Sequence, residues 1–169
     1  MSSKINLLVV VRDHLATLKD EATGKTSVAD VVTMFVLPAI CSAIAGVLGY
    51  KIDEAAVEIV VGVFAIFAGL LLNVLVLIYG LSDAPTDDEK AKEKKQTKDT
   101  LLRQSFANIS YEILVSLLVV VVLWVTLLSG EVGVRVASCL FIFLAVHFFL
   151  TLLMVLKRMH VLLADRFGP

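Results

Sequence analysis

The chain has 169 residues, a net charge of −1 and a mean hydropathy of +0.92, and 59% of its residues are apolar. Soluble domains need only about half of their residues to be apolar, so this composition excludes an ordinary soluble protein and predicts an all-α integral membrane protein. The near-zero net charge argues against direct binding of double-stranded DNA, and Cys41 and Cys139 form neither a C-x-x-C motif nor a disulfide framework.

The N-terminal stretch, residues 1–26, predicts a short helix that lies in the membrane interface on the cytoplasmic side. Its apolar run is too short to cross a bilayer, and no small-residue cleavage site follows it, so a signal peptide is not expected. Apolar side chains recur there at helical spacing, with charged residues between them, at Ile5, Leu8, Val9, Leu15 and Leu18.

Residues 28–50 predict the first transmembrane helix. Pro38 lies inside this span, where it removes one backbone hydrogen bond and favours a kink. Small side chains gather on one helical face and predict close packing against a neighbouring helix. The members of this face are Ser42, Ala45, Gly46 and Gly49.

Residues 55–81 predict the second transmembrane helix, and a four-residue turn joins it to the first. Gly62, Gly69 and Asn73 share one of its faces. We interpret this face as a tight helix contact in which Asn73 makes one interhelical hydrogen bond. The alternative is that it forms the wall of a pore or ligand path.

Residues 82–104 form a charged cytoplasmic connector that carries twelve of the 31 formal charges, six acidic and six basic. Its lysines can present positive charge to an anionic nucleotide or to lipid headgroups. They are Lys90, Lys92, Lys94, Lys95 and Lys98. Acidic residues precede them, however, and the Glu-to-Lys spacings also fit ordinary pairing on a solvated helix. Both interpretations stay open.

Residues 108–129 and 135–156 predict the third and fourth transmembrane helices, which form a second hairpin, and residues 157–169 predict a short cytoplasmic tail that continues as an interfacial helix. A polar stripe marks each of these helices. The first stripe comprises Ser105, Asn108, Glu112 and Ser116, and the second comprises His147, Thr151, Met154 and Arg158.

The distribution of positive charge predicts the orientation. Thirteen of the fifteen Lys and Arg residues fall in the N-terminal stretch, the connector or the tail, whereas only Lys51 and Arg135 fall near the two short turns. The positive-inside rule then places both termini and the connector in the cytoplasm, with the protein crossing a bacterial inner membrane.

With this orientation, the polar residues of the spans gather in their cytoplasmic halves. An ionisable group in the bilayer core costs about 2.5–3.5 kcal/mol or more, so it normally faces a bundle interior or a hydrated cavity. We therefore predict a polar vestibule that opens to the cytoplasm, lined by Asp30, Asn73, Glu112, His147 and Thr151. The alternative is that the two acids lie at headgroup level and that His147 bonds one backbone carbonyl.

No motif indicates catalysis. The sequence contains no H-E-x-x-H, no G-x-S-x-G and no phosphate-binding glycine loop. Enzyme activity, a metal site and other cofactors are therefore not expected.

The layout of the chain resembles that of the RexB-like small four-span membrane proteins of phage-exclusion systems. The features that carry the resemblance are Leu37–Pro38, the glycine-bearing stretch 62–80, Tyr111–Glu112 and the basic tail after Leu156. The connector departs from it, being longer and balanced in charge. The resemblance implies a cytoplasmic-membrane effector that depolarises infected bacteria when a partner or signal triggers it.

Two functions follow as hypotheses. The first is a homo-oligomeric, gated ion-conducting pore of antiphage defence that responds to a cytoplasmic partner protein or nucleotide signal. The second is a non-conducting structural or accessory subunit of a transporter or another membrane complex, in which the polar stripes serve helix packing.

Overall fold

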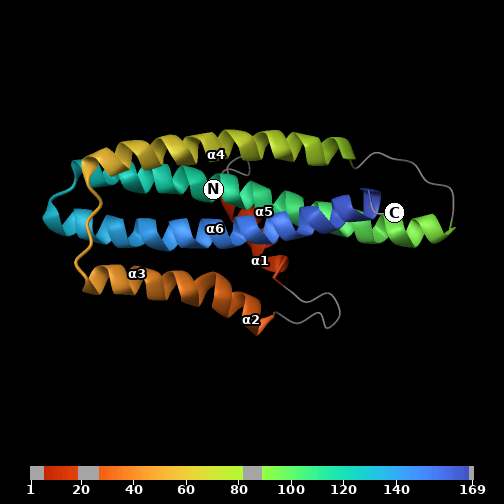
Figure 1. Ribbon diagram of the computed structural model, residues 1–169, viewed down its shortest axis with the longest axis horizontal. Coiled ribbons are helices and arrows are strands. Elements are labelled where there is room, and N and C mark those ends of the chain that lie inside the picture. Colours follow the sequence, from red (N-terminus) through yellow and green to blue (C-terminus); the bar gives the residue numbers. More distant parts are fainter. Residues whose placement is uncertain (1–5, 19–26, 82–88, 168–169) are drawn as a thin grey trace.

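The computed structural model shows a bundle of long helices (Figure 1). It describes residues 6–18, 27–81 and 89–167, with side chains described for all of these except 81, 89–98 and 162–167. No strand occurs in this described part, and four of its helices are long and apolar enough to cross a membrane. These are Val28–Val47, Glu54–Gly80, Asp99–Leu128 and Glu131–Val161. The prediction of an all-α protein with four transmembrane helices is confirmed.

The elements follow one another as a short helix and four long ones. Helix α1 (Leu7–Ala16) precedes a continuous segment built from α2 (Val28–Val31), the π-helical turn η2 (Val32–Val36) and α3 (Leu37–Val47). The remaining helices are α4 (Glu54–Leu81), α5 (Glu89–Leu128) and α6 (Glu131–Phe167). Most of the stretch expected as connector and most of the expected tail are therefore helical continuations of α5 and α6.

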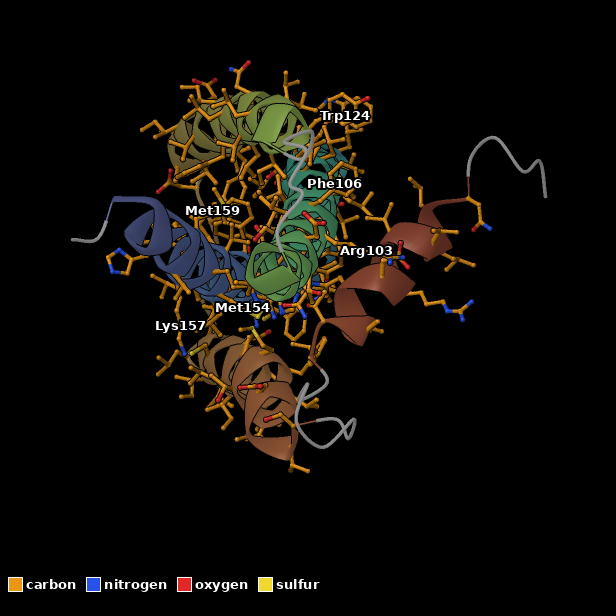
Figure 2. All side chains as sticks on the ribbon, turned by 90° about the vertical axis from the view of Figure 1, so that its right-hand side faces the viewer. Arg103, Phe106, Trp124, Met154, Lys157 and Met159 are labelled. Atoms are coloured by element: carbon orange, nitrogen blue, oxygen red, sulfur yellow. The ribbon has the colours of Figure 1, made fainter. Side chains whose placement is uncertain are left out.

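The long helices pack around the pair α5 and α6. Helix α4 packs on α5, α5 packs on α6, and α6 packs on α3, whereas α1 packs on α5. In the described residues α3 and α4 do not pack on each other although a short turn joins them, because they lie on opposite sides of the α5–α6 pair (Figures 1 and 2). Helix α1 runs across the bundle instead of along it (Figure 2).

The bundle has two different ends. At the loop end, the short connections between α3 and α4 and between α5 and α6 lie together, and at the connector end α5 begins and α6 finishes (Figure 1). The loop end is held by polar contacts between its two connections. The Lys51 ammonium lies 2.6 Å from the Glu131 carboxylate, and the Ile52 backbone N–H donates to the Ser138 hydroxyl over 3.0 Å.

Bulky side chains decide which face of α4 turns inward. Val57, Phe64, Leu71 and Ile78 recur every seven residues and are all buried against α5 and α6. Phe64 lies 5.0 Å from Phe148 of α6 between ring centroids, in an edge-to-face arrangement. These large side chains make many more van der Waals contacts with α5 and α6 than glycines would, so the glycine face of α4 points outward.

Pro38 shapes the helix that contains it. In a regular α-helix the residue 38 N–H would donate to the Met34 carbonyl, but proline has no N–H and its ring clashes with that carbonyl. The backbone widens into η2 at this point, where the Leu37 N–H donates to the Val32 carbonyl five residues earlier. The Met34 carbonyl consequently loses its regular helical donor and needs another partner.

The helix ends in a glycine cap. Gly49 has φ +67°, in the left-handed region, and the Tyr50 N–H donates to the Ala45 carbonyl over 2.9 Å. The Gly49 N–H donates to the Gly46 carbonyl over 3.1 Å, which completes a Schellman motif.

Candidate functional site

Polar side chains from α1, α5 and α6 form a buried cluster in the connector half of the bundle. The Tyr111 ring is partly buried, and the other members are at most 8% exposed: His14, Thr17, Ser105, Asn108, Glu112, His147 and Thr151. Glu112 stands 16 residues before the end of α5, or about 24 Å from the loop end at 1.5 Å per residue. The cluster therefore lies within the depth of the bilayer on the connector side.

His147 replaces the donor that Pro38 removes. Its Nδ1 lies 2.8 Å from the Met34 carbonyl oxygen, which only accepts, so Nδ1 carries the hydrogen. In the neutral ring Nε2 then accepts, and the Tyr111 hydroxyl donates to it over 2.9 Å. Both nitrogens of His147 are satisfied, and Phe35 and Phe143 pack against its ring.

His14 brings α1 onto this cluster. Its ring stacks on Tyr111 at 3.9 Å between centroids, and its Nδ1 lies 2.9 Å from Asn108 Oδ1. Burial lowers the pKa of His14 to about 4, although the hydrogen bond to Asn108 raises it. The ring is therefore neutral near pH 7, so Nδ1 donates and Nε2 is an acceptor.

The end of α1 is tied to both long helices. The Thr17 hydroxyl lies 2.8 Å from Asn108 Oδ1 and 2.8 Å from the His14 carbonyl oxygen. Arg158 of α6 donates to the Thr17 carbonyl over 3.0 Å. These contacts fix α1 across the connector half of the bundle.

Four side chains of the cluster have buried polar atoms without a hydrogen-bond partner in the described part of the chain. They are both carboxyl oxygens of Glu112, Nδ2 of Asn108, Nε2 of His14 and Oγ of Ser105. Buried polar groups are normally satisfied, so such a concentration within one membrane protein calls for a ligand, a proton or water. The loop half differs, because its buried hydroxyls on Thr126 and Ser138 both bond backbone groups.

A pocket of about 450 Å³ lies beside the cluster, between α1 and the early turns of α5. Its polar lining comes from Asp13, Thr17, Thr100, Arg103 and Gln104, and Phe106 is among its apolar residues. Figure 2 shows Arg103 on the side of α5 that faces α1. Thr17 belongs to both the pocket and the cluster, so the two are adjacent.

The structure brings together three of the five residues expected to line a vestibule. Glu112, His147 and Thr151 meet in the cluster, whereas Asp30 and Asn73 are exposed on the outside of the bundle. Asn73 shares the outward glycine face of α4, and Asp30 stands at the start of α2, so the expectation that they line the same cavity is corrected. The alternative expected for His147, a bond to one backbone carbonyl, is what the structure shows.

The small face of the first span packs as expected at three positions. Ser42 donates to the Cys139 carbonyl over 2.8 Å, Ala45 is buried, and a Cβ added at Gly46 would lie 3.3 Å from Cys139 Sγ. Gly49 is corrected, because its role is the helix cap and nothing lies within 4 Å of its added Cβ.

The expected packing face of α4 is also corrected within this chain. Gly62 and Gly69 are exposed, and an added Cβ at either position would meet nothing within 4 Å. The side chains of Lys90, Lys92, Lys94, Lys95 and Lys98 lie outside the described residues. No group of three or more His, Cys, Asp or Glu side chains that could hold a metal occurs among the residues that are described.

The sequence interpretation did not anticipate the roles of Met34, His14 and Tyr111. A signal for Met34 exists, because the residue four before a proline always loses its helical donor. Nothing comparable marks His14, since its position on α5 depends on the path of the chain between α1 and α2.

Comparison with protein families matched residues 15–140 to the family described as "Branched-chain amino acid transport system / permease component". The match covers about three quarters of the chain. The chain belongs to this permease-component family. The matched segment includes Asn108 and Glu112 of α5 and ends before His147. Comparison with curated proteins and with solved structures found no match.

As a member of this permease-component family, the chain is a multi-pass membrane protein and a transporter subunit. The buried polar cluster therefore belongs to a protein of a transport family.

Proposed function

We propose that this chain is the membrane-embedded component of a transport system for branched-chain amino acids and that it forms the translocation path together with other subunits. The family match over residues 15–140 is the observation that carries this proposal. The chain contributes helices and a polar cluster, and the complete path needs helices from elsewhere.

The bundle itself supports the need for partners. The polar cluster and the pocket both lie in the connector half. The interior of the loop half is filled by apolar side chains such as Val119, Leu123 and Leu144. Asn73 meanwhile exposes an amide on the outer face of a transmembrane helix, where lipid offers it no hydrogen bond. A helix of another subunit would satisfy that amide and pack closely on the adjoining glycines.

The same proposal includes an orientation in the bacterial inner membrane, with the connector end in the cytoplasm. Lys51 and Arg135, the only cations near the short turns, both contact Glu131, at 2.6 and 3.3 Å. The positive-inside rule counts Lys and Arg residues, so these two cations against the thirteen on the other side favour this orientation.

A gated antiphage pore, the function implied by the RexB-like layout, gains no comparable support. The accessory or transporter-subunit hypothesis agrees better with the family.

Uptake measurements test the proposal. Cells that lack the gene should lose energised uptake of radiolabelled leucine, isoleucine and valine, and the wild-type gene should restore it. Uptake of glutamate should not change and serves as the control. Unchanged leucine, isoleucine and valine uptake in the deletion strain would refute the assignment.

Bilayer recordings separate the two functions. The purified chain should pass no current in planar bilayers, because it lacks a complete path on its own. A reproducible current from the purified chain alone would favour the pore hypothesis.

A further inference from the structure

The carboxyl group of Glu112 has no hydrogen-bond partner in the described residues, although it is completely buried. Its side chain is 0% exposed, and both oxygens lack a donor. No ion pair joins it to a Lys, Arg or His in the part of the chain that the structure describes. An ionised carboxylate in such surroundings would carry an uncompensated charge inside the membrane, which strongly disfavours the charged form.

The hydroxyl groups next to Glu112 are engaged elsewhere, whereas Asn108 Nδ2, one turn earlier on α5, has no acceptor in the described residues. The Tyr111 hydroxyl donates to His147, and the Ser116 hydroxyl donates to the backbone carbonyl of Glu112 itself. The Thr151 hydroxyl lies beside the carboxyl and is within reach of two other acceptors, the His147 carbonyl oxygen at 3.1 Å and Met34 Sδ at 3.9 Å. Its lone pairs stay available, so Thr151 suits the O–H of a neutral carboxylic acid better than it suits a carboxylate.

The titratable groups around Glu112 offer no countercharge. Tyr111 adjoins it on α5, while α6 contributes His147, which is satisfied as a neutral ring, and Arg158, which bonds the Thr17 carbonyl. Helix α1 contributes His14, which is neutral near pH 7. The described ionisable residues of the other two packed segments are exposed or lie toward the loop end: Asp30 and Cys41 in the first, and Glu54, Glu58 and Tyr79 in α4.

A row of unsatisfied groups connects Glu112 to the pocket. Ser105 and Asn108 precede Glu112 by seven and four residues on the same face of α5, and His14 of α1, whose Nε2 is also unsatisfied, contacts Asn108 through Nδ1. The pocket between α1 and α5 lies beside Thr17, which contacts Asn108. Water molecules that enter from the pocket would find donors and acceptors along this row as far as Glu112.

We propose that Glu112 is a proton-binding site of the bundle, loaded and unloaded from the connector end along the row formed by Ser105, Asn108 and His14. The ligand is a proton carried by water, and α1 covers its entrance. The site goes beyond the proposed transport function and does not depend on it, because proton binding is measured on the purified chain without any substrate.

Carbodiimide labelling in vesicles tests whether the carboxyl holds a proton. A hydrophobic carbodiimide adds to a protonated carboxyl: the carboxyl proton moves to a carbodiimide nitrogen, the oxygen bonds the central carbon, and rearrangement gives a stable N-acylurea. Mass spectrometry should find this adduct on Glu112 at pH 7 and not on Glu58, which is exposed in α4. Labelling should fall about tenfold per pH unit once the carboxyl ionises.

Three outcomes decide the matter. A pH-dependent adduct on Glu112 supports the proposal, whereas a folded protein with no adduct there overturns it. Protection of Glu112 by sodium ions at constant pH would also overturn it, because the carboxylate would then hold a metal cation.

Infrared spectroscopy tests the path. The C=O band of a protonated carboxyl should disappear in Glu112→Gln, which keeps the size and neutrality of the acid and should fold. In wild type this band should shift on transfer to D₂O, and Asn108→Leu should slow the shift by about tenfold or more. Ser110→Leu is the control, since Ser110 bonds only the Phe106 carbonyl and should leave the rate unchanged. Equal rates for both variants would remove Asn108 from the path.

Discussion

The contact between His147 and the carbonyl released by Pro38 predicts a strong energetic coupling between these two residues. The perturbation is a double-mutant cycle with Pro38→Ala and His147→Leu. Alanine restores an N–H at position 38, which can donate to the Met34 carbonyl in a regular helix. The Met34 carbonyl then no longer depends on His147, whose Nδ1 lies 2.8 Å away in the wild type.

The expected magnitude follows from the hydrogen bonds of the His147 ring. His147→Leu removes two of them, each about 0.6 kcal/mol on average in a membrane, and leaves the Met34 carbonyl unpaired at a further cost of about 1–3 kcal/mol. We expect a total loss of about 2–4 kcal/mol in the wild-type background. In the Pro38→Ala background the loss should fall to about 1 kcal/mol, so the coupling energy is about 1–3 kcal/mol.

The assay is unfolding by SDS titration in mixed micelles, followed through the fluorescence of Trp124, the single tryptophan of the chain. His160→Leu is the matched control, because His160 is exposed on the same helix. Its effect should add to that of Pro38→Ala within about 0.3–0.5 kcal/mol. The same additivity for His147→Leu would refute the reasoning that His147 replaces the proline's missing donor.

Three further predictions test packing, electrostatics and orientation. Gly46→Leu should destabilise the bundle by about 1–3 kcal/mol in the same titration, because the new Cβ would lie 3.3 Å from the Cys139 sulfur on α6. Val47→Leu is the control and should be tolerated, since Val47 is 89% exposed. Equal effects of the two variants would rule out this contact. Burial holds the pKa of His14 at about 4, so on acidification the unfolded chain takes up a proton on this residue before the folded chain does. The contribution of His14 to the free energy of unfolding should therefore be fully present above about pH 6.5, and the free energy of unfolding should fall by up to about 3 kcal/mol as the pH drops to about 4. His14→Phe should flatten that part of the stability profile, and an unchanged slope would contradict the assignment. In a variant without native cysteines, a cysteine at position Lys51 should react with an impermeant thiol reagent added outside intact cells, and one at Lys94 should not; the reverse result would invert the topology.

The hydrophobic pattern was sufficient to predict the helices because the lipid core sets both their length and their composition. It did not predict where α5 begins, since the charged turns of residues 89–104 are as compatible with a solvated helix as with a loop, whereas the helical tail after residue 156 was expected and forms one continuous helix with α6. With 40 and 37 residues, α5 and α6 are both longer than the roughly 20 residues that cross a bilayer. Helical extensions outside the apolar spans are harder to tell from loops in a sequence, because only side-chain propensity and local ion pairs support them.

Periodicity predicted the site only in part. Spacing placed Glu112 on one stripe and His147 with Thr151 on another, and the structure joins these stripes. The same spacing grouped Asn73 with glycines, but periodicity shows which residues share a face and not what that face contacts. Bulky side chains on the opposite face of α4 decided its rotation, and this competition was visible in Phe64 and Leu71.

The distribution of satisfied and unsatisfied groups indicates where the bundle can move. At the loop end, Ser42, Lys51 and Ile52 each bond a group near the start of α6. In the connector half, the described contacts that hold the π-helical turn to α6 by hydrogen bonds are the His147 bond to the Met34 carbonyl and a long contact from the Thr151 hydroxyl to Met34 Sδ, at 3.9 Å. Because one full-strength bond and one weak thioether contact are easier to exchange for water than the three bonds at the loop end, displacement of the first transmembrane helix should pivot about the loop end and open the connector end. The carboxyl of Glu112 lies beside Thr151, which contacts Met34 of this turn, so we expect displacement of the helix to change the rate of proton exchange at Glu112.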